Sequence, residues 1–230
     1  MSSTSVDRLR RFVNRATDHS SCDLCRSELP DRHRHLLELV QRRMLCACDA
    51  CALLFGDANG SRIRPIPESV TRIELNMSDQ QWSGLGIPIG MAFFTVCDRE
   101  VSRESSSIRS LSPDVTVRHS AEATTDAAPV QVGYPSPAGL VMSSVEQDDW
   151  LALIDANPAV GRLRPEVESL LINRLASRQQ AFVVPLDVCF ELIGIVRRHW
   201  EGWSAGPDLQ RAMDGFFDQL EICAGKGAPE

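Results

Sequence analysis

Four cysteines in two closely spaced pairs constrain this sequence more than any other feature. Cys22 and Cys25 form one Cys-x-x-Cys pair, and Cys48 and Cys51 form the second. Each short turn directs two sulfurs to one side, and a hairpin between the pairs would gather all four around one ion in a tetrahedral cage. The gap from Cys25 to Cys48 holds 22 residues, and the gap to Cys46 holds 20. We therefore predict a metal site of Cys22, Cys25, Cys48 and Cys51, with Cys46 as an alternative ligand.

The stretch between the two pairs predicts a β-hairpin. Residues 33–40 and 44–47 are rich in apolar side chains and are separated by a short polar link. A helix over 33–44 with one apolar side is the competing interpretation. We prefer the hairpin because its second strand would deliver the chain into the second cysteine pair. Residues 52–55 would then form an apolar strap against the site.

The cysteine pattern favours zinc as the metal. Zinc is the usual ion of four-thiolate structural sites, and iron in a rubredoxin-like site is the alternative. Rubredoxin-type turns carry glycine directly after the second cysteine, where this sequence has Arg26 and Ala52. A disulfide framework is disfavoured because residues 1–18 contain four arginines and no apolar core, unlike a secretion signal.

Length and composition predict one main hydrophobic core beside a small metal module. The chain has 230 residues, of which 43% are hydrophobic, and no run of eighteen apolar residues. We expect a cytoplasmic protein with no membrane span. The net charge of −7 argues against a general polyanion binder. Residues 1–64, however, contain eleven Arg against eight Asp and Glu, so nucleic-acid binding by the ribbon stays a second alternative function.

The remaining sequence predicts an α+β domain with a mainly antiparallel sheet and packed helices. A segment rich in Ser, Thr and Ala, without periodicity, predicts a mobile insertion. The run 167–172 is also compatible with a helix, but we favour a strand. The expected parts are a leader helix or disordered segment at 1–17, the metal-binding ribbon at 18–56, the α+β domain at 62–222 with its mobile insertion at about 99–129, and a disordered tail at 223–230. The expected strands are 62–66, 71–75, 91–96, 130–134, 167–172 and 181–184, and the expected helices are 79–85, 146–156, 188–200 and one that begins at Pro207.

Two helices carry more specific expectations. In the helix over 146–156, we expect Trp150, Leu151 and Ile154 to be buried. Asp187 is expected to be the N-cap of the helix over 188–200, because a short acidic side chain accepts hydrogen bonds from the first backbone N–H groups.

The sequence contains none of three common catalytic motifs: Gly-x-Ser-x-Gly, a phosphate-binding glycine loop with lysine, and His-Glu-x-x-His. Asp187, Cys189 and His199 are a weak candidate set, because a helix would hold His199 about 15 Å from the other two. We therefore expect a protein that is not an enzyme. Trp200 and Trp203 are candidate partner contacts, since tryptophan anchors many interfaces.

Several stretches of the chain resemble DUF5947, an uncharacterised actinobacterial family. The resemblance covers most of the chain apart from residues 98–129 and the two ends. It rests on Cys22-x-x-Cys25, His33-Arg34-His35-Leu36-Leu37, Leu45-Cys46-Ala47-Cys48-x-x-Cys51-Ala52-Leu53-Leu54-Phe55, Tyr134-Pro135-Ser136-Pro137-Ala138-Gly139, Asn157-Pro158, Val167-Glu168-x-Leu170-Leu171-x-Asn173-Arg174, Val184-Pro185-x-Asp187-x-Cys189 and His199-Trp200-x-Gly202.

Such proteins tend to be encoded beside [NiFe]-hydrogenase genes. The resemblance thus implies an accessory protein whose partner is a hydrogenase subunit or maturation factor. The resulting hypothesis is a non-enzymatic metal-ribbon protein that binds a partner protein. An electron-transfer protein with rubredoxin-like iron, or a thiol-redox protein, is the first alternative.

Overall fold

The computed structural model describes residues 21–56, 62–98, 115–118, 128–136, 139–175, 178–200 and 206–226. The chain divides into two compact units, with the boundary between Pro65 and Ile66 and with residues 39–41 belonging to the second unit. The leader expected at 1–17 lies outside the described residues.

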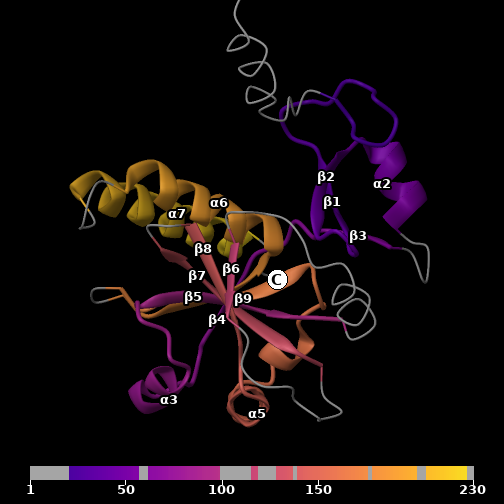
Figure 1. The fold of residues 1–230 in the computed structure, drawn as a ribbon. Helices are drawn as coiled ribbons and strands as arrows, with labels where there is room; N and C mark the ends of the chain where they lie inside the picture. The colour runs from indigo at the N-terminus through magenta and orange to yellow at the C-terminus, as the bar shows by residue number, and fades with distance from the viewer. Residues whose placement is uncertain are drawn as a thin grey trace, which may run out of the picture. The chain divides into compact units, whose positions relative to one another are not determined.

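The N-terminal unit contains a three-stranded antiparallel sheet and one helix, which lies in the chain between the second and third strands (Figure 1). In the hairpin, Leu36 lies directly opposite Leu45, so the two side chains share one face of the sheet, and both are buried. The hairpin prediction is confirmed, and the helix over 33–44 is wrong. The elements are β1 (Arg34–Glu38), β2 (Arg43–Ala47), α2 (Asp49–Gly56) and β3 (Ile63–Pro65), with strand order β2-β1-β3.

Strand β3 belongs to the N-terminal unit, although we expected residues 62–66 to open the α+β domain. It pairs antiparallel with β1, with Leu37 opposite Arg64. An unpaired strand edge leaves backbone groups without partners, and β3 satisfies those of β1 on the side away from β2.

The expected strap at residues 52–55 is wrong, because these residues lie in helix α2. Ala, Cys and Leu dominate its middle and no β-branched residue interrupts it, so helical propensity prevails. Leu53 and Leu54 are each 74% exposed and therefore do not cover the cysteine site.

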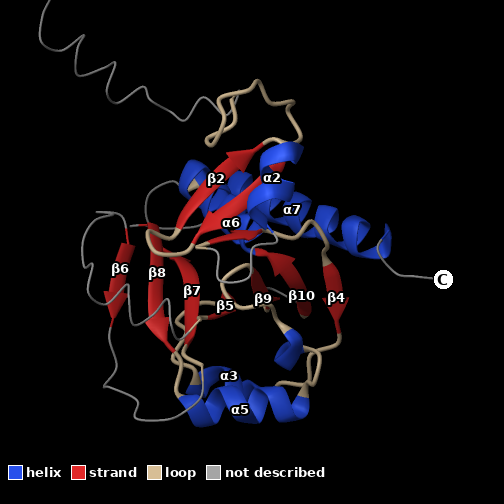
Figure 2. Cartoon of the chain, turned by 90° about the vertical axis from the view of Figure 1, so that its right-hand side faces the viewer, coloured by secondary structure: helices blue, strands red, loops and turns tan. Residues whose placement is uncertain are grey.

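The second unit is built on a seven-stranded sheet of order β4-β10-β9-β5-β7-β8-β6 (Figure 2). The pairing that we expected between residues 91–96 and 130–134 is confirmed, with Phe93 opposite Gly133. The strand favoured over 167–172 is confirmed, with observed bounds of Glu168–Asn173. All pairs are antiparallel except β6 with β8. The strands are β4 (Thr71–Ile73), β5 (Met91–Val96), β6 (Val115–Arg118), β7 (Val130–Ser136), β8 (Gly139–Ser144), β9 (Glu168–Asn173) and β10 (Gln180–Pro185).

Helices cover both faces of this sheet, which explains why its central strands are apolar at consecutive positions. Phe93 faces a core shared with α6 and α7, whereas Phe94 faces the opposite core and stacks on Trp150 of α5 at a ring distance of 6.0 Å. Figure 1 shows α6 and α7 on one side of the sheet and α3 and α5 on the other. The helices are α3 (Asp79–Gly84), α5 (Gln147–Ala156), a 3-10 turn η1 (Val160–Arg162), α6 (Leu186–His199) and α7 (Pro207–Lys226).

Several expected helix details need correction. Helix α6 begins at Leu186, directly after Pro185, so Asp187 is not the N-cap but lies in the first turn, where its Oδ1 accepts a hydrogen bond from Val188 N–H at 2.9 Å. On α5, Leu153 is buried and Leu151 is 45% exposed. Residues three positions apart share one face of a helix, so Leu153 lies on the buried face with Trp150, whereas the adjacent Leu151 does not.

Helix α7 continues to Lys226, beyond the expected end of the domain at residue 222. No helix in the described part of the chain combines the length and the apolar character needed to span a membrane.

The expected insertion at about 99–129 contains at least one regular element. Residues 115–118 form β6, whose backbone pairs in parallel with β8, with Val115 opposite Leu140. An edge strand of four residues gains its hydrogen bonds from the neighbouring strand, which local sequence does not reveal.

Candidate metal centre

The first cysteine pair sits on a tight turn. Cys22 N–H donates to the Ser27 carbonyl at 2.7 Å, and Arg26 N–H donates to the Cys22 carbonyl at 2.8 Å. Arg26 has a φ of 65°, the left-handed conformation that glycine adopts most easily. The turn therefore has the backbone of a glycine-bearing cysteine knuckle although arginine stands at the glycine position. The Cys22 thiol is buried and that of Cys25 is exposed.

The second pair sits at the start of a helix. Cys48 directly precedes α2 and Cys51 lies in its first turn, with Ala52 N–H donating to the Cys48 carbonyl at 2.9 Å. Cys48 N–H points to the first pair and donates to Cys22 Sγ at 3.4 Å. Backbone N–H groups at a helix N-terminus favour negative charge, so this position suits thiolates.

The structure brings the four cysteines together as the spacing predicted. Their Sγ atoms all lie within 4.8 Å of one another, and Cys25 Sγ lies 3.7 Å from Cys48 Sγ. Two sulfurs that each lie about 2.3 Å from a tetrahedral zinc ion are separated by about 3.8 Å. The cluster has the donor set and the size to hold a metal ion.

The surroundings of the cluster lower the pKa of two of its thiols, Cys22 and Cys48, and raise that of a third, Cys51. Burial opposes ionisation of Cys22, but hydrogen bonds from the backbone N–H groups of Cys25, Cys48 and Leu24 outweigh it and lower the Cys22 pKa to about 6. The backbone N–H of Cys51 lowers the pKa of Cys48. Burial raises the pKa of Cys51 to about 12, and hydrogen bonds with the other thiols add to this. A divalent cation would reverse the effect on Cys51 by stabilising its thiolate.

Cys46 belongs to a different group of side chains. Among the described residues, its Sγ lies within 4.8 Å of ring nitrogens of His33 and His35, and this trio shares no member with the four-thiol cluster. Burial raises the pKa of Cys46, and the neighbouring Asp23 carboxylate adds to this. Our sequence analysis did not single out the two histidines as ligands. Their spacing of two residues in a predicted strand was the available signal, because such residues share one face.

The other residues that we had considered lie in the second unit. Trp200 is half-buried against the core of α6 and α7, and Trp203 lies outside the described residues. Burial raises the pKa of Cys189, whose side chain is fully enclosed. His199 Nδ1 lies 2.9 Å from the Ile195 carbonyl of its own helix. The structure does not arrange Cys189 and His199 for joint chemistry.

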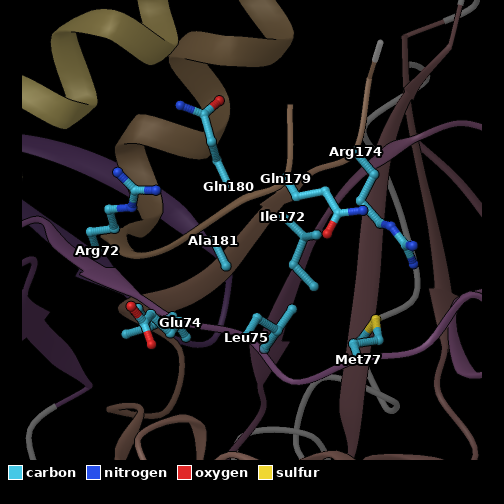
Figure 3. Close-up of a pocket in the computed structure, with 10 residues that line it drawn as sticks. Arg72, Glu74, Leu75, Met77, Ile172, Arg174, Gln179, Gln180 and Ala181 are labelled. Atoms are coloured by element: carbon cyan, nitrogen blue, oxygen red, sulfur yellow. The ribbon is translucent and has the colours of Figure 1, made fainter. Parts of the chain in front are cut away.

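The second unit also has a small pocket at the β4–β10 edge of its sheet. Its volume is about 210 Å³, below the range of roughly 300 to 1,000 Å³ that is typical of small-molecule sites. Figure 3 shows Arg72 and Arg174 on opposite sides, with Ile172 and Leu75 between them. Arg72 is paired with Glu221 at 2.9 Å, and Arg174 pairs with Asp79 and lies over the Trp82 ring. Both arginines thus have protein partners.

The fold and the site define a class of protein: an α+β chain with an N-terminal, ribbon-like cysteine module that could hold a metal ion. The chain belongs to DUF5947, a family of unknown function, whose sequence profile it matches over residues 21–113 and 105–224. The two matches meet inside the segment that we expected to be an insertion. Searches of curated proteins and of solved structures find no match.

Proposed function

We propose that this chain is a non-enzymatic accessory protein that binds a partner protein and whose N-terminal module is folded by one structural zinc ion. The observation that carries the proposal is the cluster of Cys22, Cys25, Cys48 and Cys51, with all four Sγ atoms within 4.8 Å of one another. A closed four-thiolate site leaves no coordination position for a substrate, as is usual for structural zinc.

The small core of the module supports a structural role for the ion. Among the described residues, its buried cluster contains seven, three of which are cysteines, whereas each core of the second unit contains twelve or more. A core of that size contributes little free energy, so metal–sulfur bonds would provide most of the stability of the module.

The exposed side of helix α2 supports partner binding. Leu53, Leu54 and Phe55 are consecutive large apolar residues, and all three are exposed, by 74%, 74% and 43%. A helix that presents such residues fits an apolar groove on another protein. We propose that α2 contacts the partner, and that Trp200 and Trp203 form a further contact.

The family resemblance supports a hydrogenase subunit or maturation factor as the partner. Free thiols support a reducing, cytoplasmic setting, since all eight cysteines of the chain are unpaired.

Affinity purification of the full chain from its native host tests the partner proposal. We expect Leu54→Asp to abolish co-purification of the partner. Leu151→Asp is the matched control, because Leu151 is an exposed leucine on helix α5 of the second unit. Equal recovery of the partner with both variants would contradict a role for α2.

A visible absorption spectrum separates this proposal from electron transfer. The exposed Cys25 thiol would give electrons access to an iron ion in the same four-thiol site. Iron–thiolate centres are coloured and zinc centres are colourless, so colour in natively purified protein would favour the electron-transfer function.

A further inference from the structure

We propose that His33, His35 and Cys46 form a second metal site, which binds one zinc ion with an open coordination position. The three donor atoms lie within 4.8 Å of one another. The site shares no ligand with the four-thiol cluster, but it lies on the same module and so rests on the proposed function in that the four-thiol ion folds this module.

The β-hairpin itself brings the three side chains together. His35 of β1 is the direct cross-strand partner of Cys46 of β2. Side chains in such pairs start about 5 Å apart at Cβ. His33 directly precedes β1 and lies two residues before His35, so an extended backbone places both rings on the same side. The rings meet edge to face with their centroids 5.0 Å apart.

The hydrogen bonding of His33 prepares its second nitrogen for a ligand. His33 Nδ1 lies 3.0 Å from the Pro30 carbonyl, which can only accept, so Nδ1 donates and the neutral ring has its lone pair on Nε2. Nε2 is buried and has no hydrogen-bond partner within the described part of the chain. Histidine ligands of metals typically donate their other ring N–H to a backbone carbonyl, as His33 does.

Two hydrogen bonds hold the backbone at Cys46 in place. Cys46 N–H donates to Asp23 Oδ2 at 2.7 Å, and the Cys46 carbonyl accepts from Asp23 N–H at 2.8 Å. The Cys46 side chain is 7% exposed, while His33 and His35 are half-buried. The site therefore has an enclosed thiol on a well-anchored backbone and two imidazoles nearer the surface.

Two neutral imidazoles and one thiolate suit Zn²⁺. A tetrahedral zinc ion would hold these donors about 3.3 to 3.6 Å apart, which small side-chain rotations can reach from the present separations. The bound ion would keep one positive charge. Its fourth position would be filled by water or a small anionic ligand, as in zinc sites with three protein ligands.

Counting zinc ions per chain tests this site. The full chain is stripped of metal by chelation with its thiols reduced, titrated with Zn²⁺ alone, and measured by native mass spectrometry. We expect two ions for the wild type and one for both His33→Gln and Cys46→Ser. His199→Gln and Cys223→Ser are matched controls from the second unit and should keep two.

Further variants separate this site from the four-thiol cluster. Cys48→Ser should bind at most one ion, because the second site lies on the module that the four-thiol ion folds, and Cys48→Ser combined with His33→Gln should bind none. A wild type that saturates at one ion, lost in Cys48→Ser but kept in His33→Gln, would overturn the second site and leave the first intact. Two ions in both His33→Gln and Cys46→Ser would also overturn it. One ion lost in His33→Gln but kept in Cys48→Ser would instead support this site and contradict the four-thiol proposal.

Discussion

Asp23 and Cys46 are joined by two hydrogen bonds, one in each direction. Asp23 N–H donates to the Cys46 carbonyl at 2.8 Å, and Asp23 Oδ2 accepts from Cys46 N–H at 2.7 Å. Asp23 lies inside the first cysteine turn and Cys46 lies on the strand that leads to the second pair. These bonds therefore hold the two halves of the four-thiol cluster in register.

Removal of the Asp23 carboxylate should loosen the module. Asp23→Ala leaves Cys46 N–H without its acceptor, which should cost about 1 to 3 kcal/mol of unfolding free energy. Limited proteolysis of the zinc-loaded protein should then cleave the N-terminal unit faster. Asp31→Ala is the control, because Asp31 is an exposed aspartate of the same unit. Equal cleavage rates for the two variants would show that the hydrogen bond between Asp23 Oδ2 and Cys46 N–H does not stabilise the module.

Arg26→Gly should stabilise the module. Arg26 has a φ of 65°, and a non-glycine residue in this region costs on the order of 1 kcal/mol. We expect tighter zinc binding and slower proteolysis of the variant. Arg32→Gly is the control. Arg32 does not have a positive φ, so its replacement by glycine should not increase the stability of the module. A loss of stability in Arg26→Gly would mean that the arginine side chain makes a contact worth more than the strain.

Zinc binding by the four-thiol site should strengthen as the pH rises. Zn²⁺ binds thiolates, so protons compete with it. Burial raises the pKa of Cys51 to about 12, so this thiol stays protonated near neutral pH and must release its proton on binding. The apparent affinity should thus rise at least about tenfold per pH unit between about pH 6.5 and 8. Below the Cys22 pKa of about 6, Cys22 adds a second proton and a steeper slope.

Competition with a chelator of known proton affinity measures this slope. The Cys46→Ser background removes the proposed second site from the titration. An affinity that does not change with pH would contradict the protonated state of Cys51.

Substitution of Gly133 in the central sheet should destabilise the second unit without affecting the N-terminal module. Gly133 lies between Phe93 and Met142 on the neighbouring strands, and an added Cβ would meet the Phe93 ring and lie 2.7 Å from Met142 Sδ. Gly133→Ala should lower the unfolding free energy of the second unit by about 1 to 3 kcal/mol. Gly194→Ala is the control. That helical position has no atom within 4 Å of an added Cβ, and alanine there should stabilise by up to about 1 kcal/mol.

Calorimetry and zinc content together check this prediction. The thermal transition of the second unit should fall in Gly133→Ala and rise in Gly194→Ala, with the zinc content equal in both. Chelation should expose the N-terminal module to protease while leaving the transition of the second unit in place. Loss of that transition on chelation would contradict the independence of the two units.

Residue spacing predicted the parts of the fold that depend on local pattern. The Cys22–Cys25 and Cys48–Cys51 pairs, the hairpin between them and the apolar strand Met91–Val96 are all where the sequence placed them. Cysteine pairs with two residues between them, and strands with alternating side chains, allow few other local structures.

The features that the sequence analysis missed depend on partners distant in the chain or on competing propensities. The His33–His35–Cys46 trio becomes visible only once the register pairs His35 with Cys46. Strand β6 exists through its parallel pairing with β8. Helix α2 was misjudged for a different reason: its Ala and Leu residues already favoured a helix, but the expected strap was inferred from a need to cover the metal.

The zinc content and visible spectrum of natively purified protein test the central claim most directly. We predict a colourless protein that contains zinc and no iron. In the Cys46→Ser background, which removes the second site, Cys22→Ser and Cys51→Ser should each lose the remaining ion. Cys97→Ser, a change at a buried thiol of the second unit, should keep that ion. A coloured protein with iron and a reversible one-electron couple would contradict the account, as would zinc retained by a Cys46→Ser variant in which both Cys22 and Cys51 are replaced by serine.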